Sequence, residues 1–200
     1  MVLDTNLKLL GKFSYDDVQL KDPGLKEYVS LKPRYMPHTF GRHADAQFKK
    51  ANVPIVERLI NKLMSPGKGS ETRKTHKFGG KKKKASQIVL QALEIIKKKT
   101  GEKSIQVVCS AIENAAPREE IVRISRGGIY RRYSVDVSPQ RRLDLAIRHL
   151  VRGGRQKSFN TPKKLPESLA GELISASNDS LNSYAIQKKA DTERIAENAR

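Results

Sequence analysis

The spacing of apolar residues constrains the fold of this chain more than any other feature. Over most of its 200 residues, apolar side chains recur every three or four positions, the period of a helix with one buried face. Between residues 121 and 137 the spacing shortens to two, the period of a β-strand. The pattern predicts a mainly α fold: a single helical domain of about six helices with one pair of strands.

Capping and breaking residues mark where the helices begin and end. Helices are expected from about residues 54, 84, 104, 138, 166 and 183. Ser138 and Pro139 suit the cap and the first position of the fourth, and Gly153-Gly154 are interpreted as its end. The residues expected to face the core are Ile55, Val56, Leu59, Ile60 and Leu63; Ile88, Val89, Ala92, Leu93 and Ile96; Ile105, Val108, Cys109 and Ile112; Leu143, Ala146, Ile147 and Leu150; Leu169, Ala170, Leu173 and Ile174; and Ile186 and Ile195.

The two strands are joined by a glycine pair. Gly127 and Gly128 tolerate the positive φ that a tight hairpin turn demands, so a β-hairpin is expected over residues 120–137. An isolated two-stranded ribbon is marginal in water. We therefore expect its base to pack on helices and its tip to project.

The first fifty residues show no sustained period. Asp22-Pro23-Gly24, Pro33 and Pro37 interrupt them. We expect residues 1–50 to form a largely irregular N-terminal extension with at most one short helix near Gly24–Ser30. Residues 51–200 are expected to form the helical domain.

The charge of the chain points to a polyanionic partner. Forty Lys and Arg against 21 Asp and Glu leave a formal net charge of +19. Nucleic acid is the first candidate and an anionic membrane surface the second. The sequence has no run of about 18 apolar residues and no secretory signal, so the membrane is disfavoured. One cysteine, Cys109, suits a reducing compartment, and the cytosol is expected.

The densest basic stretch is a Gly- and Pro-interrupted loop over residues 66–84. It ends in Lys81, Lys82, Lys83 and Lys84. Such a loop is either flexible and solvated or a basic arm that becomes ordered on phosphates. The two interpretations are compatible.

The hairpin carries the clearest nucleic-acid signal. Its arginines alternate with tyrosines; guanidinium groups bind phosphates bidentately, and both residue types stack on exposed bases. The alternative is that these charges only protect the strand edges. The expected RNA-binding residues are Arg123, Arg126, Gly127, Gly128, Tyr130, Arg131 and Arg132 of the hairpin, Arg141 and Arg142 after it, Lys81 to Lys84, and Arg34, Tyr35, His38 and Arg42 of the extension.

Catalytic patterns fail on inspection. Ser65–Ser70 resembles a phosphate-binding loop, but Gly69 follows the lysine where Ser or Thr is needed. The four histidines lack metal-ligand spacing. Cys109 belongs to an apolar stripe. We expect no active site, no metal and no cofactor; an RNA-processing enzyme and a free-standing nucleic-acid-binding protein remain the alternatives.

Several segments resemble a known family. They are Val53–Met64, Ala111–Glu120, Val135–Arg142 and Ser183–Ile186. In their order they are similar to the universal small-subunit ribosomal protein family, numbered seven in bacteria and five in eukaryotes, and the resemblance runs from about Gly11 to Arg200. Tyr35–Arg42 resembles the extension of archaeal and eukaryotic members, and Arg141–Ala146 is closest to archaeal ones. The sequence departs from the family pattern at Ser70–Lys84, a stretch that is longer than the usual loop of the family.

The resemblance implies a structural role in translation. Family members bind the 3′ major domain of small-subunit rRNA and help assemble the head. Their β-hairpin lies near the exit site, close to tRNA and mRNA, and they approach neighbouring head proteins and small-subunit protein eleven of the platform. By position, the hairpin from Arg123 to Arg132 would fill this place here.

Overall fold

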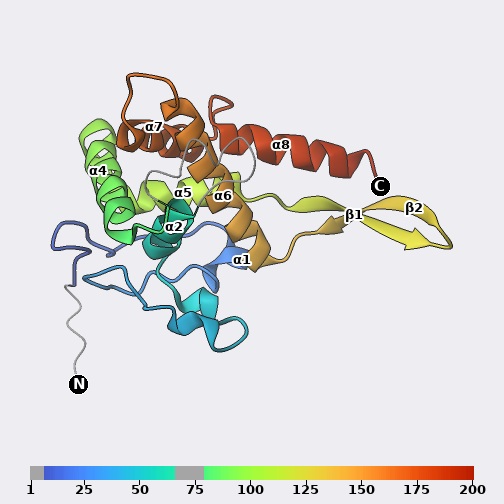
Figure 1. The fold of residues 1–200 in the computed structure, drawn as a ribbon, viewed down its shortest axis with the longest axis horizontal. Coiled ribbons are helices and arrows are strands. Elements are labelled where there is room, and N and C mark those ends of the chain that lie inside the picture. Colours follow the sequence, from blue (N-terminus) through green and yellow to red (C-terminus); the bar gives the residue numbers. More distant parts are fainter. Residues whose placement is uncertain (1–6, 66–78) are drawn as a thin grey trace.

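The computed structural model describes residues 7–65 and 79–200, and within them the chain is mainly helical (Figure 1). Seven α-helices and one two-stranded antiparallel sheet form in this part of the chain, which confirms the expected fold class. The elements are α1 (Pro23–Lys26), α2 (Ile55–Met64), α4 (Lys82–Thr100), α5 (Ser104–Ala115), β1 (Glu119–Arg126), β2 (Ile129–Asp136), α6 (Pro139–Ser158), α7 (Leu165–Ser177) and α8 (Tyr184–Glu197), with 3-10 turns η1 (Arg42–Ala44) and η2 (Lys49–Asn52).

The core is built from the apolar stripes that the spacing indicates. The expected inward residues of α2, α4, α5 and α6 are all buried. α7 lies among them and packs on α4, α5 and α6, so its own apolar residues are shared between three neighbours. Cys109 is a buried part of α5, and burial raises the pKa of its thiol to about 12. It is therefore a packing residue that stays protonated at neutral pH.

The N-terminal segment is irregular, as expected, but it is packed on the helices. Leu9, Phe13 and Leu25 are buried in the same core as α2 and α5. Gln19 and Gln106 of α5 exchange two hydrogen bonds, of 2.9 and 3.0 Å, through the backbone of Gln19. Residues on both sides of position 50 thus contribute to one core. The division of the chain at that position stays a prediction.

The expected end of α6 at the two glycines is wrong. The helix continues through Gly153 and Gly154 to Ser158. A Cβ on Gly153 would lie 2.6 Å from Oε1 of Glu172, and a Cβ on Gly154 would lie 3.1 Å from Cα of Leu169. Both glycines are buried where α6 crosses α7. They permit close helix packing instead of ending the helix.

A second contact also holds the end of α6. The guanidinium of Arg155 lies at the C-terminal end of α2, where Nη2 donates to the carbonyl oxygens of Leu63 and of Ser65, the latter at 2.8 Å. Carbonyls at a helix end have no intrahelical partner and favour cations. Arg155 thus joins α6 to α2.

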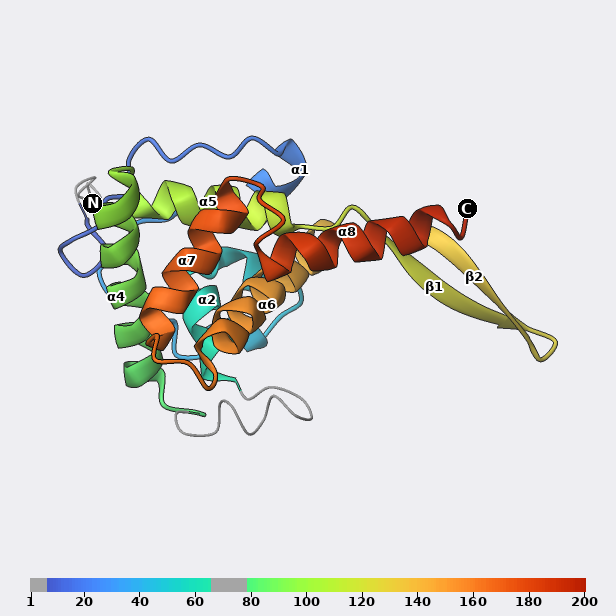
Figure 2. The ribbon, with the colours of Figure 1, turned by 90° about the horizontal axis from the view of Figure 1, so that it is seen from above.

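The β-hairpin projects from the helical body (Figures 1 and 2). Gly127 and Gly128 have φ of 58° and 81°, so the turn has the expected left-handed geometry. α8 runs beside the base of the hairpin in both views. The base is packed and the outer part is free of the helices, as expected for a ribbon that cannot be stable alone.

The last helix is less amphipathic than its spacing indicates. Ser183 caps α8 by accepting a hydrogen bond from the backbone amide of Ile186, which is buried. Ile195, also expected to face inward, is 48% exposed. The end of α8 has left the helical body and lies beside the strands, where no core exists to cover Ile195.

Candidate nucleic-acid interface

The register of the hairpin sorts its arginines onto two faces. Arg123 lies directly opposite Arg132, and Ile124 lies opposite Arg131. Residues directly opposite share a face, and neighbours along a strand point to opposite faces. Arg123 and Arg132 therefore lie on one face, and Arg131 lies on the other with Arg126. Both faces offer two guanidinium groups.

The face of Arg123 and Arg132 is polar. Their like charges are directly opposed across the strands, an arrangement that destabilises an isolated hairpin. Tyr130, next along this face toward the turn, is 75% exposed. A bound phosphate would relieve the repulsion between the two guanidinium groups, and the ring of Tyr130 is free to stack on a base.

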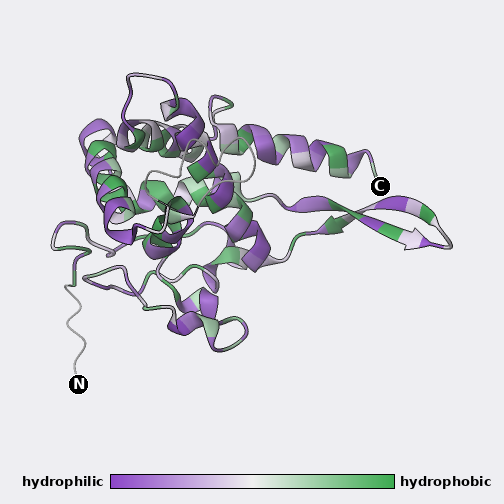
Figure 3. Cartoon of the chain, in the orientation of Figure 1, coloured by the Kyte–Doolittle hydropathy of each residue, from purple (hydrophilic) through white to green (hydrophobic). Residues whose placement is uncertain are grey.

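The other face combines arginines with exposed apolar side chains. Ile129 is 65% exposed, and Val122, Ile124, Tyr133 and Val135 are also exposed. Figure 3 shows hydrophilic and hydrophobic residues together on the projecting strands. A contiguous apolar surface on a soluble protein marks a contact site. This face is therefore suited to a partner with both apolar and anionic groups.

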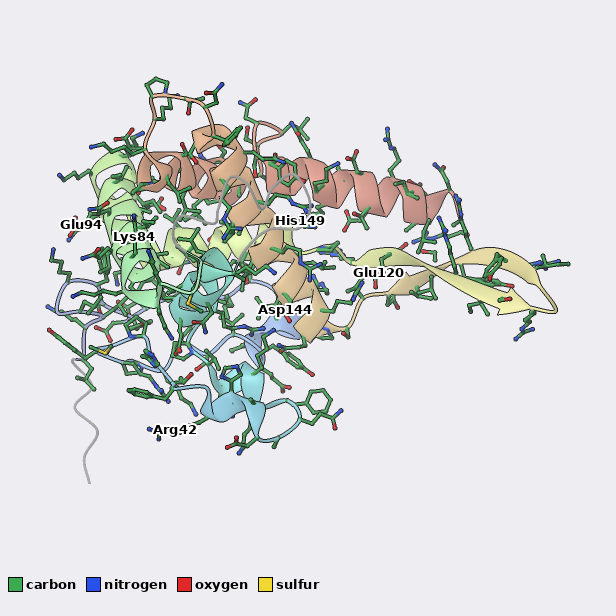
Figure 4. The ribbon with its side chains drawn as sticks, in the orientation of Figure 1. Arg42, Lys84, Glu94, Glu120, Asp144 and His149 are labelled. Atoms are coloured by element: carbon green, nitrogen blue, oxygen red, sulfur yellow. The ribbon has the colours of Figure 1, made fainter. Side chains whose placement is uncertain are left out.

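The acidic residues of the two strands lie at the base of the hairpin, and both glutamates there are ion-paired. Glu120 lies 2.6 Å from Arg141 at the start of α6, and Figure 4 shows it where the ribbon leaves the body. Glu119 binds Arg200 and accepts a hydrogen bond of 3.1 Å from Ser134. The tip is left with arginines.

Arg141 and Arg142, expected to contact RNA, both hold the protein together in this structure. Besides the Arg141 contact with Glu120, Arg142 lies 2.8 Å from Asp22 and donates to the carbonyl of Pro117 at 3.2 Å. Although burial acts in the opposite direction, the ion pair lowers the pKa of Asp22. Arg141 is exposed enough to reach a phosphate as well, whereas Arg142 is 12% exposed.

The lysine run at residues 81–84 is divided by its fold. α4 begins at Lys82, so three of the four lysines form its first turn instead of a loop. Lys82 is 2.8 Å from the buried carboxylate of Glu57, while Lys83 and Lys84 are exposed. The rest of the expected basic loop, residues 66–78, lies outside the described residues.

The expected residues of the N-terminal extension lie close to one another. Arg34, His38 and Arg42 line one cavity of about 400 Å³ beside η1. Tyr35 follows Arg34 in the chain, and its side chain is 57% exposed. Figure 4 shows Arg42 on this segment, well away from the hairpin. The structure thus separates the expected RNA-binding residues of the extension from those of the hairpin.

A further basic group was not anticipated from the sequence. Lys50, Arg58, Lys62 and Arg148 line a cavity of about 220 Å³ between the N-terminal segment, α2 and α6. Asp144 lies in it and is ion-paired with Lys50 at 2.6 Å and Arg58 at 2.9 Å. Burial and the charge of Arg148 lower the pKa of Lys62, as expected where positive charge is in excess.

A periodic signal for this group exists in α6. Arg141, Arg148 and Arg152 recur at spacings of seven and four, on the side away from the apolar stripe of that helix. Lys62, on α2, joins them only through the packing of α2 against α6. Charge periodicity could have indicated Arg148, but not Arg58 or the two lysines.

Two negative results concern the described residues only. No helix in residues 7–65 and 79–200 is long and apolar enough to span a membrane. In the same part of the chain, no three His, Cys, Asp or Glu residues lie close enough to hold a metal ion.

The comparisons with known proteins fit a basic helical body with a projecting hairpin. Residues 25–200 match the family described as ribosomal protein S7p/S5e. The chain belongs to this family. It is also 46% identical over 199 residues to the small ribosomal subunit protein uS7 of the archaeon Nanoarchaeum equitans (strain Kin4-M), covering 97% of this chain and 99% of that protein.

Family membership makes the chain a structural constituent of the ribosome. It is a cytoplasmic protein of the small subunit that works in translation, and it is not an enzyme. As such a constituent, its partners include rRNA and other ribosomal proteins. The resemblance noted in the sequence is confirmed, and an archaeal relative matches nearly the whole chain.

Proposed function

We propose that this ribosomal protein binds the 3′ major domain of small-subunit rRNA and helps assemble the head. Its hairpin is placed near the exit site, where it contacts tRNA and mRNA. Residues 51–200 form the RNA-binding domain in this proposal, and residues 1–50 form its N-terminal extension.

The observation that carries the proposal is the charge arrangement of the hairpin. Arg123, Arg126, Arg131 and Arg132 are all exposed, and the glutamates of the ribbon are ion-paired at its base. A ribbon that projects beyond the helical body can reach RNA that the body does not touch (Figure 1). Contacts between guanidinium groups and phosphates fix such an element on RNA without requiring a particular base sequence.

The hairpin also supports a protein contact. Its apolar face exposes Val122, Ile124 and Ile129 together with two arginines. We assign this face to a neighbouring ribosomal protein, with head proteins and small-subunit protein eleven of the platform as the partners that the family resemblance implies. The opposite face, with Arg123 and Arg132, is then free for RNA.

Co-sedimentation tests the assignment to the subunit. We expect the tagged protein to sediment with small subunits in moderate salt and to be released by ribonuclease, because charge contacts with RNA hold it. Recovery only in the free pool would contradict the proposal and favour a free-standing nucleic-acid-binding protein. Cross-links from Arg123 or Tyr130 to the 3′ major domain would support the finer placement, and cross-links only to other rRNA domains would contradict it.

A further inference from the structure

A phenylalanine with an unusual backbone lies exposed in the N-terminal segment. Phe40 has φ of 54°, in the left-handed region that bulky residues rarely adopt, and its side chain is 71% exposed. An exposed apolar ring in a strained conformation gains nothing from burial. Such strain persists only where the surrounding contacts impose it, and it gathers at ligand sites.

The contacts that impose this conformation involve Thr39, directly before Phe40, and the backbone amide of Phe40 itself. The backbone amide of Thr39 donates to Oε1 of Glu57 at 2.8 Å, and its hydroxyl donates to the same oxygen at 3.0 Å. Glu57 is buried in α2 and is held by Lys82. The amide of Phe40 donates to Nδ1 of His38 at 2.9 Å. The backbone at Phe40 is thus fixed by Thr39, which is hydrogen-bonded to a buried carboxylate, and by His38.

Aromatic and cationic groups surround the exposed ring. The centroid of the His38 ring lies 4.2 Å from that of Phe40, and the guanidinium of Arg42 lies 5.8 Å from the Phe40 centroid. All three line the cavity of about 400 Å³, within the range of small-ligand sites. Arg34 and Lys49 add positive charge to its lining, Asp45 adds one carboxylate, and Asn52 adds an amide that can both donate and accept.

We propose that this cavity binds an unpaired RNA nucleotide whose base stacks on Phe40. The inference rests on the proposed RNA-binding function and names a base-stacking site within it. Aromatic faces accept any base, cations bind the adjoining phosphates, and single-stranded loops are where RNA exposes bases. The excess of cations at the cavity favours RNA over an apolar protein segment.

The neighbouring cavity offers a path for the RNA backbone. The cavity of Lys50, Lys62 and Arg148 shares His43 and Val53 with the cavity of Phe40, so the two are adjacent. A base on Phe40 therefore brings its flanking phosphates to a second basic group. One stretch of unpaired RNA would occupy both cavities.

The test uses fluorescence of a base analogue. The probe is a single-stranded 12-nucleotide RNA with a central 2-aminopurine, and a duplex of the same sequence is the comparison. We expect the wild-type protein to quench the single strand and Phe40→Leu to lose the quench. The affinity of Phe40→Leu for the single strand should fall about 5- to 150-fold, the effect of one stacked base.

Two variants control for folding and for general charge binding. Phe40→Tyr keeps an aromatic face and should keep both quench and affinity. Phe48→Leu changes another phenylalanine with positive φ, 67% exposed but outside the cavity lining, and should behave as wild type. Duplex binding should be the same in all variants, because it depends on charge alone.

Several results would overturn the stacking site. The first is that the wild-type protein does not quench the fluorescence of the single strand. The second is that Phe40→Leu binds the single strand as tightly as the wild-type protein does. The third is that Phe48→Leu loses as much affinity as Phe40→Leu, or that Phe40→Leu loses as much affinity for the duplex as for the single strand. Loss of Phe40→Leu from small subunits without any effect on the RNA probe would point to a protein neighbour and would also contradict it. If rRNA binding still depends on the hairpin arginines, the proposed function stands although this inference fails.

Discussion

Gly153 lies where α6 meets the buried carboxylate of α7, and the space there is too small for a side chain. A Cβ would lie 2.6 Å from Oε1 of Glu172 and 2.9 Å from Cβ of Tyr184. We expect Gly153→Ala to lower the free energy of unfolding by about 1–3 kcal/mol through overpacking, measured by urea denaturation. A Cβ added to Gly171, on α7, would have no atom within 4 Å, so Gly171→Ala should stabilise by up to about 1 kcal/mol. Equal stability of the two variants would contradict this account.

His149 is a second residue whose environment has a measurable effect. Burial, followed by the charges of Arg152, Arg148, Lys188 and Lys62, lowers its pKa to about 4. An unfolded histidine titrates near 6.5, so below that pH the unfolded chain binds the extra proton. The contribution of neutral His149 to stability is complete above about pH 6.5 and is lost as pH falls toward 4, by at most about 3 kcal/mol.

Urea denaturation at pH 7 and pH 4.5 tests this effect. The decrease in the free energy of unfolding on acidification should be smaller in His149→Gln than in the wild-type protein, because glutamine does not titrate. The same decrease in both proteins would show that His149 is protonated in the folded state.

At the scale of elements, one buried carboxylate holds α8 to the body. Glu172 of α7 accepts hydrogen bonds from the hydroxyl of Ser183 at 2.7 Å and the amide of Ala185 at 3.1 Å, and it is ion-paired with Lys157 of α6 at 2.6 Å. We expect Glu172→Gln to destabilise the protein by about 1–3 kcal/mol, because an amide cannot satisfy all three donors. The exposed Glu167, on the same helix, provides the control Glu167→Gln.

Hydrogen exchange shows which helices are destabilised in Glu172→Gln. In Glu172→Gln the amides of α8 should lose protection before those of α5, since the contact joins α8 to the rest. Uniform loss over both helices, or loss of α8 protection in Glu167→Gln, would contradict the anchoring role.

Elements were predictable where a local pattern decides them. The apolar stripes and the Gly127-Gly128 turn indicated the helices and the hairpin, because periodicity and turn geometry are properties of neighbouring residues. The continuation of α6 through Gly153 was not, because a glycine pair is equally suited to a helix end and to a close crossing. The close approach of Glu172, Tyr184 and Leu169 distinguishes the two.

The residues of the candidate site were predictable from the sequence only in part. Arginines on a hairpin can be read from the sequence, but which of them share a face depends on register. The partners of Arg142 and Lys82 lie 120 and 25 residues away, so their internal ion pairs could not be foreseen. The cavity of Lys50, Lys62 and Arg148 joins three distant segments, and only Arg148 among these residues has a local signal, the charge periodicity of α6.

At the scale of the whole molecule, the positive charge is spread over separate surfaces. The hairpin lies at one end of the molecule and α4 at the other, with the N-terminal segment along one side (Figures 1 and 4). A net charge of +19 on such a body suits a protein that contacts several stretches of RNA at once. In this account the hairpin arginines contribute specific phosphate contacts beyond the general attraction.

The salt dependence of binding to the isolated 3′ major domain tests this central claim most directly. Each phosphate contact contributes about 0.7–0.9 to the slope of log K against log salt. Arg123→Ala with Arg132→Ala, on the face proposed for RNA, should therefore weaken binding and reduce the slope by about 1.5. Lys97→Ala with Lys98→Ala removes the same charge from exposed positions of α4, far from the hairpin, and should leave the slope at the wild-type value. An unchanged slope in the hairpin variant, with its helical fold intact, would contradict the claim that this ribbon binds rRNA.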